Sequence, residues 1–253
     1  MKEQPDSPAP PQSKLASPRF GSHVPIDSSK IQGRSYGGIL LYYRDAIFDK
    51  IQRSESLNGM IAYFMLWSII FAAAFGCLLG FFSRNLQIVS GALKVPILLW
   101  GSLAICLPAL FTFNVLLGSK LSFKQTAAVL AMTTYLISTV LVSLSPIVFF
   151  FIICASVKGF VILLTVIAFS IAGLFGVSLL WNAMGYLTER AGYAYDSKII
   201  KAWTVIYMFV GTQFAWILRP FVGDPGEFAW LRTIGGNFYT GLFQIITDLF
   251  TKG

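Results

Sequence analysis

The chain has 253 residues, of which 56% are hydrophobic and only 12% are charged, and its formal net charge is +8. A soluble domain carries about 25% charged residues, so a soluble globular fold is excluded and an all-α, polytopic integral membrane protein is expected. The basic residues stand singly between apolar runs, which argues against a nucleic-acid partner. Their positions instead favour loops that set orientation and meet anionic lipid headgroups of the bilayer.

Residues 1–36 differ from the rest of the chain. They contain six of the eleven prolines and seven serines. Such a segment buries too little apolar surface to offset the entropy of ordering it, so it predicts a disordered tail. It has no apolar stretch of the kind found in a signal peptide.

The next segment, 37–56, contains a helical pattern over residues 39–53. Leu40, Tyr43, Ile47 and Ile51 fall on one stripe, while acidic and amide side chains lie opposite. Fifteen residues with this much charge are too short to span a bilayer. The pattern indicates either an amphipathic helix in the membrane surface or a helix packed on the cytosolic face of the protein itself.

Residues 57–218 form the expected transmembrane domain. A span needs about 20 apolar residues, and five runs qualify: 60–82, 95–117, 126–157, 159–186 and 202–218. The third run is ambiguous because Pro146 stands in its middle, so it is either one long tilted or kinked span or a hairpin of two short segments. Counting basic residues near span ends favours five crossings with the N-terminus inside, because more of these residues then lie on the inner side.

Residues 219–253 form an extramembrane or interfacial C-terminal segment. Within it, residues 237–250 give a second amphipathic stretch that begins at a plausible N-cap, Asn237. Its length predicts an interfacial helix on the side of the membrane opposite the N-terminal one.

The sequence offers no catalytic or metal-binding group. His23, in the tail, is the only histidine, and no Asp or Glu occurs between Leu57 and Thr188. Acid–base catalysis, a proton relay and metal ligation all need such residues. We therefore expect a protein that is not an enzyme and has no metal or cofactor.

Small residues recur every four positions in two of the runs. Ala72, Gly76 and Gly80 do so in the first, and Ala172 and Gly176 in the fourth. This spacing predicts close helix packing, either inside the bundle or between copies in a homo-oligomer.

A second set of residues is polar within or near the apolar runs. An unpaired amide or hydroxyl in lipid is costly, so these side chains are expected to make interhelical contacts. The hydroxyl groups in the third run allow a second interpretation, the lining of a pore. The set is Asn114, Thr134, Ser138, Asn182 and Gln213.

The end of the last run, G-T-Q-F-A-W-I-L-R-P-F-V-G at 211–223, combines Trp216, Arg219, Pro220 and Phe221. Trp and Arg suit the headgroup boundary, and Pro220 stops the helix. The segment is either a membrane anchor with a helix stop or a docking site for a lipid headgroup or a partner.

The order of a polar tail, a pre-membrane amphipathic segment and five spans resembles the Yip (Ypt-interacting protein) family and its uncharacterised bacterial relatives. The resemblance covers about 57–218 and includes G-S-K-L-S-F-K-Q-T-A-A-V-L at 118–130, while A-W-I-L-R-P-F-V-G resembles a segment of the bacterial proteins. The D-L-Y-G-P signature of the family is replaced by Leu57-Asn58-Gly59, and its Gly-Tyr has only Thr134-Tyr135 as a counterpart. The resemblance implies the topology; trafficking and small-GTPase partners belong to the eukaryotic members.

These observations lead to one functional hypothesis with two alternatives. The first is a scaffold or accessory subunit that binds other membrane protein subunits. The alternatives are a small channel or carrier that uses the hydroxyl groups around Thr134 and Ser138, and a lipid-handling protein that uses Arg219. The expected location is a bacterial inner membrane with the N-terminus in the cytoplasm, with an organellar or endomembrane location as the alternative.

Overall fold

The computed structural model describes residues 34–83, 86–116, 121–154, 158–190, 197–223, 230–231 and 236–252, and this part of the chain is all-α. Most of the expected tail, residues 1–33, lies outside it. The helices are α1 (Tyr36–Tyr42), α2 (Arg44–Gln52), α3 (Leu57–Gly80), the 3₁₀ turn η2 (Phe81–Ser83), α4 (Gln87–Leu116), α5 (Phe123–Cys154), α6 (Lys158–Arg190), α7 (Ser197–Leu218) and α8 (Phe238–Lys252).

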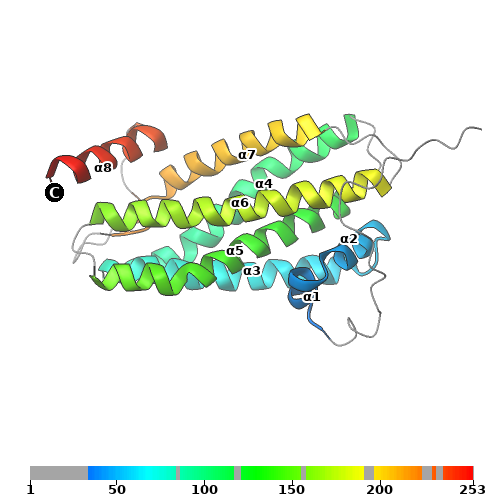
Figure 1. Ribbon diagram of the computed structural model, residues 1–253, viewed down its shortest axis with the longest axis horizontal. Helices are drawn as coiled ribbons and strands as arrows, with labels where there is room; N and C mark the ends of the chain where they lie inside the picture. Colours follow the sequence, from blue (N-terminus) through cyan, green and yellow to red (C-terminus); the bar gives the residue numbers. More distant parts are fainter. Residues whose placement is uncertain are drawn as a thin grey trace, which may run out of the picture.

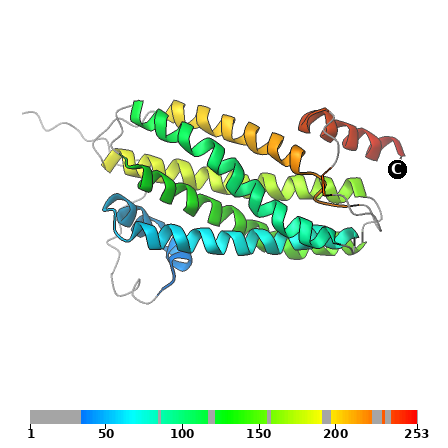
Figure 2. The same cartoon turned by 180° about the vertical axis from the view of Figure 1, so that it is seen from behind.

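The five longest helices run along one axis and form an elongated bundle (Figure 1). Successive helices from α3 to α7 run in opposite directions, so the chain makes five passes along the bundle. The short helices α1 and α2 lie at one end and α8 lies at the other. From behind, α4 crosses the bundle from the end of α3 toward α7 (Figure 2), and it packs against both.

Four of the described helices are long and apolar enough to cross a membrane, and the protein is accordingly an all-α integral membrane protein. They are α3 with η2, α4, α5 and α6. The fifth expected span, 202–218, lies in α7, which makes the fifth pass but is not among these four. The expectation of five crossings therefore depends on the path of α7 along the bundle.

The ambiguous third run is one continuous helix. α5 contains 32 residues with Pro146 inside it, so the hairpin alternative is wrong. At 1.5 Å per residue, α5 is about 48 Å long, which exceeds a hydrocarbon core of about 30 Å. The helix must therefore tilt in the membrane or extend beyond its edge.

The N-terminal segment differs from the single helix expected over 39–53. The helix breaks at Tyr43, whose φ of −138° and ψ of 49° are not helical, and so α1 and α2 are separate. Leu40, Ile47 and Ile51 are buried in the largest hydrophobic core of the protein. The apolar stripe thus packs on the protein itself, and the side of the membrane on which it lies stays a prediction.

Polar contacts also attach α2 to the long helices. Nε2 of Gln125 on α5 donates to the backbone carbonyls of Ile51 and Gln52, at 3.0 and 3.1 Å. The hydroxyl group of Tyr186 on α6 donates to Oδ1 of Asp49 at 2.7 Å. Because Gln125 satisfies carbonyls at the C-terminus of α2, it takes over the role of a helix cap.

Close backbone contact joins α3 to α4. A Cβ on Gly76 would clash with the carbonyl of Gly91, and a Cβ on Gly80 would clash with the backbone of Gln87. Gly76 and Gly80 are two of the three small residues noted in the first run, and they lie at an interface inside the bundle. Gly91 is their partner on α4.

The small residues of the fourth run also lie inside the protein. Ala172 is fully buried and belongs to the same hydrophobic core as Ala72. Gly176 packs against Ile137, because a Cβ added to Gly176 would have to displace the side chain of Ile137. Small side chains therefore permit close packing of α6 on α5 as well as of α3 on α4.

Candidate functional site

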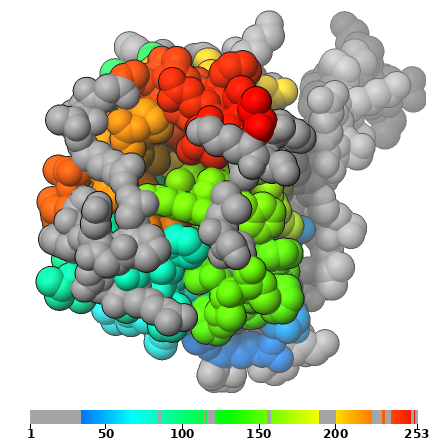
Figure 3. All heavy atoms as spheres, turned by 90° about the vertical axis from the view of Figure 1, so that its left-hand side faces the viewer, coloured from blue at the N-terminus to red at the C-terminus, as the bar shows by residue number. Residues whose placement is uncertain are grey.

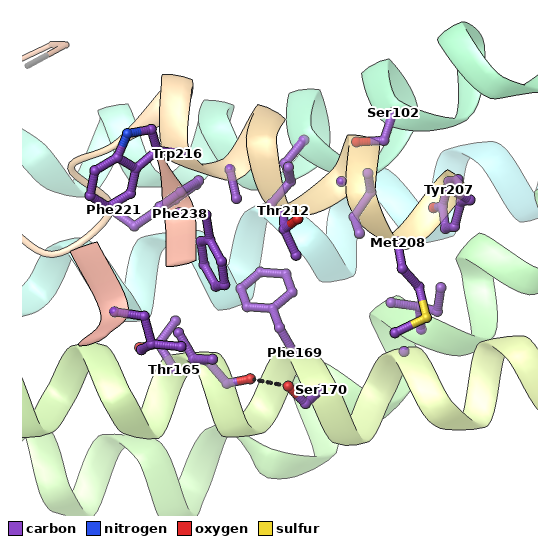
Figure 4. A pocket seen from close by; sticks show the side chains of 18 of the residues that line it. Ser102, Thr165, Phe169, Ser170, Tyr207, Met208, Thr212, Trp216, Phe221 and Phe238 are labelled. Atoms are coloured by element: carbon purple, nitrogen blue, oxygen red, sulfur yellow. Dashed lines mark hydrogen bonds between the residues drawn. The ribbon is translucent and has the colours of Figure 1, made fainter. Parts of the chain in front are cut away.

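A large cavity forms a groove bounded by α6, α7 and α8, with residues of α4 and α5 also lining it. Its volume is about 1580 Å³. Figure 4 shows Phe169 of α6 pointing toward α7, with Phe238 of α8 and Met208 of α7 on the opposite wall. Most side chains that line it are aliphatic or aromatic. At the end where α8 lies, helices α7 and α8 form one side of the molecule and α3 and α5 the other (Figure 3).

The groove is long and open to its surroundings. Lys158 and Trp181 both line it, and the 23 residue steps between them along α6 correspond to about 34 Å. Three of its lining side chains, Leu174, Val205 and Met208, are more than half exposed. The groove therefore extends across a distance similar to the hydrocarbon thickness of a bilayer and opens sideways from the bundle.

One end of the groove holds Trp216 and Arg219, which were predicted as docking residues. The guanidinium carbon of Arg219 lies 3.4 Å from the centre of the Trp216 ring, a cation–π arrangement. Trp216 also packs tightly against Gly241 of α8. Pro220 and Phe221 line the groove beside them, so the structure brings all four predicted docking residues to one place.

The segment that carries Arg219 is anchored by α4. Nζ of Lys94 and Nε2 of Gln87 both donate to the carbonyl oxygen of Pro220, at 3.0 and 2.8 Å. A Cβ added to Gly223 would lie 2.9 Å from Cγ of Gln87, so Gly223 packs closely against this side chain. Helix α7 ends at Leu218, immediately before this segment, as the Arg-Pro pair predicts.

The burial of Lys94 shows that the predicted start of the second span is wrong. The sequence places Lys94 at a boundary outside the run 95–117, whereas α4 begins at Gln87 and Lys94 is only 1% exposed. The reason is that Pro220 supplies a backbone acceptor for the ammonium group, and the ring of Trp230 lies 5.6 Å away. A buried cation with such partners is compatible with a helix interior.

The opposite end of the groove has a second pair of a cation and a tryptophan. Nζ of Lys201 lies 5.7 Å from the centre of the Trp181 ring, and Nε1 of Trp181 donates to Oγ1 of Thr204 at 3.0 Å. Trp203 is buried beside this end, where its Nε1 donates to the carbonyl of Cys106 at 3.1 Å. None of Trp181, Lys201, Trp203 and Thr204 was predicted as a site residue.

The hydroxyl groups of the third run form bonds inside their own helix. Thr134 donates to the carbonyl of Leu130 at 3.0 Å, and Ser138 donates to the carbonyl of Thr134 at 2.9 Å. The described bonds of these two residues are intrahelical, because the nearest acceptor for a donating hydroxyl in a helix is the carbonyl four residues earlier, and the interhelical contacts stay a prediction. Thr134 lines the groove, whereas Ser138 is fully buried and does not.

The predicted amide contacts are not among the described interhelical bonds. Asn182 and Gln213 are half-buried on α6 and α7, and the side chain of Asn114 lies outside the described residues. Hydrogen bonds from tryptophan indole groups link the helices instead. Nε1 of Trp100 donates to Ser68 at 3.0 Å, in the same manner as Trp181 and Thr204.

Metal-ligating groups do not cluster in the part of the chain that the structure describes: no three His, Cys, Asp or Glu side chains are near enough to hold an ion. Comparison with family models, with curated proteins and with solved structures gives no match to this chain. The resemblance to the Yip family accordingly stays an expectation. Fold and groove together define the class of the protein as an all-α integral membrane protein with a lateral apolar groove.

Proposed function

We propose that this membrane protein binds a phospholipid, with the acyl chains in the groove between α6, α7 and α8 and the phosphate near Arg219. The observation that carries the proposal is the shape of the groove. Its volume of about 1580 Å³ exceeds the 300–1,000 Å³ of most small-molecule pockets. Its length of about 34 Å suits an extended apolar molecule better than a compact one.

The side opening of the groove favours hydrocarbon chains as its occupant. Leu174, Val205 and Met208 line the groove and are more than half exposed. In a membrane protein a lateral opening along the spanning helices faces the hydrocarbon core of the bilayer, so acyl chains can enter the groove from the side.

The end of the groove at Trp216 offers a place for the headgroup. Arg219 presents a guanidinium group, which is suited to phosphate. The stacked ring of Trp216 orients this group, and Trp and Arg together favour the interfacial region of a bilayer. Three basic side chains line the groove, those of Lys158, Lys201 and Arg219, against one described carboxyl group, that of Asp248.

Lipid retained by the purified protein tests the proposal. The full-length protein is purified in mild detergent, and bound lipid is quantified by mass spectrometry. A Cβ on Gly173, which lines the groove, would meet no atom within 4 Å, so Gly173→Phe introduces a ring at a groove position with open space around its Cβ. We expect this variant to lose the bound phospholipid, and Arg219→Gln to retain about tenfold less.

Gly59 provides the matched control, because an added Cβ there also meets no atom within 4 Å and Gly59 does not line the groove. Gly59→Phe should retain lipid as the unaltered protein does. Equal retention by Gly59→Phe and Gly173→Phe would overturn the proposal. A stoichiometric protein that is lost from Gly173→Phe would favour the accessory-subunit hypothesis instead.

For the location, we propose a bacterial inner membrane with the N-terminus in the cytoplasm. The support is the excess of basic residues on the inner side when five crossings are counted. The short helices α1 and α2 then lie at the cytoplasmic end of the bundle, and α8 lies at the outer end.

A further inference from the structure

The two ends of the groove carry the same pair of residue types. At one end Arg219 stacks on Trp216 at 3.4 Å, and at the other Lys201 lies 5.7 Å from the ring of Trp181. All four residues line the groove. Cations beside tryptophan favour the headgroup region of a bilayer, so a phosphate could be held near either membrane face.

Hydroxyl groups occur at intervals between these ends. Along α6, Thr165 lies about 10 Å from Lys158 and Ser170 lies about 18 Å from it, at 1.5 Å per residue. Both line the groove (Figure 4). Their hydroxyl groups donate to carbonyl oxygens of their own helix at 2.8 Å.

The series continues on the neighbouring helices. Thr133 of α5 lies beside Gly176 of α6, because a Cβ added to Gly176 would be 3.5 Å from Cγ2 of Thr133. Gly176 is about 27 Å from Lys158 along the axis of α6. Thr204 of α7 is hydrogen-bonded to Trp181, at about 34 Å. Projected on the axis of α6, each hydroxyl group therefore lies about 10 Å or less from the next.

The hydroxyl oxygens of Thr133, Thr165 and Ser170 keep lone pairs that can accept hydrogen bonds. A hydroxyl that donates to its own helix can still accept hydrogen bonds. Ser102, which is 3% exposed, adds a buried Oγ at the groove that has no hydrogen-bond partner among the residues the structure describes. Such acceptors favour a headgroup that carries N–H donors, and the terminal cations favour its phosphate.

We propose that the groove conducts phospholipid headgroups between the two leaflets, with phosphoethanolamine as the preferred headgroup. This proposal rests on the proposed lipid binding. During transfer the acyl chains leave the groove for the membrane through its side opening, while the headgroup moves along the groove. Leu174, Val205 and Met208 are exposed along this opening. Helices α6 and α7 contact each other sparsely. The movement is passive and involves no chemical step.

The test uses the full-length protein in phosphatidylcholine vesicles that contain a trace of acyl-NBD-labelled phosphatidylethanolamine. Dithionite added outside reduces the label that it can reach. Protein-free vesicles should lose only the outer-leaflet share of the fluorescence, and vesicles with protein should lose nearly all of it. A water-soluble NBD compound trapped inside must stay fluorescent, which shows that the vesicles do not leak. Loss of the outer share alone in vesicles that contain the protein overturns the proposal.

Substitutions locate the path. Thr165→Val with Ser170→Ala should slow transfer about tenfold. The matched control is Thr139→Val with Ser143→Ala on α5, because these hydroxyl groups donate to their own helix in the same way and do not line the groove. Equal rates for the two double variants would assign the transfer to another route and overturn the proposal.

The remaining outcomes separate this proposal from lipid binding. If transfer is absent while the purified protein still retains phospholipid, only the leaflet-to-leaflet path fails. If Gly173→Phe loses neither lipid nor transfer, lipid binding in the groove fails as well. Acyl-NBD-labelled phosphatidylcholine, whose headgroup has no N–H donor, should move more slowly than the phosphatidylethanolamine. Equal rates would exclude the hydroxyl oxygens as selective acceptors.

Discussion

The ammonium group of Lys94 donates a hydrogen bond of 3.0 Å to the carbonyl oxygen of Pro220, 126 residues later in the chain. Gln87, two turns earlier on the same face of α4, donates to the same oxygen at 2.8 Å. The segment after α7 is therefore held from inside the bundle. Because this segment carries Arg219, the pair positions one end of the groove.

Lys94 and Gln87 donate to the same carbonyl oxygen, that of Pro220. The effects of Lys94→Met and Gln87→Leu on the free energy of unfolding should therefore be strongly coupled. Each single variant leaves the carbonyl with one partner and should lower the free energy of unfolding by about 1 kcal/mol. The double variant leaves a buried carbonyl unsatisfied, so its loss should exceed the sum of the single losses by about 1–3 kcal/mol. Unfolding in detergent, followed for all four proteins of the cycle, measures this coupling; additive losses would contradict it.

The contact between α3 and α4 predicts a large penalty for Gly91→Ala. The new methyl group would meet the carbonyl oxygen of Gly76, and because this obstacle is backbone the helices must move apart. We expect a loss of about 1–3 kcal/mol in unfolding free energy. Gly59→Ala, whose methyl group has open space, should be neutral or stabilising by up to about 1 kcal/mol. Similar midpoints of thermal unfolding for both variants would refute the packing argument.

The close contact between Gly241 of α8 and Trp216 of α7 predicts that this contact holds α8 against α7. An added side chain would collide with the six-membered ring of Trp216, so Gly241→Val should detach α8 from α7. Backbone amides of α8 should then exchange with deuterium faster than in the unaltered protein. Thr247→Val, on the exposed face of α8, is the control and should leave the exchange unchanged. Unaltered exchange in Gly241→Val would show that α8 is held by other contacts.

How much of this arrangement the sequence could predict depends on the range of the interaction. Gly76 and Gly80 stand four apart, so their common helix face is visible locally. Trp216, Arg219, Pro220 and Phe221 are consecutive or one turn apart, so their shared location was also predictable. The burial of Lys94 was not, because its acceptor lies 126 residues away and is a backbone atom, which leaves no mark in the sequence.

Local chemistry was also misleading in places. The break at Tyr43 occurs without a proline or glycine, and the burial of both flanking helices against the bundle stabilises it. The hydroxyl of Thr134 has an acceptor within its own helix, and the sequence cannot show which acceptor it chooses. The groove itself depends on the separation of α6 from α7, which no periodicity encodes.

The path of the chain predicts the location of the two termini. Five passes place α1 and α2 at one end of the bundle and α8 at the other, so the ends of the chain should lie on opposite sides of the membrane. A reporter that fluoresces only in the cytoplasm, fused to the C-terminus of the full-length protein and expressed in a bacterium, should stay dark, while an alkaline phosphatase fusion at the same position should be active. The fluorescent reporter fused at the N-terminus is the control and should fluoresce. The reverse pattern at the C-terminus would mean that the four most apolar helices alone cross the membrane and that α7 does not.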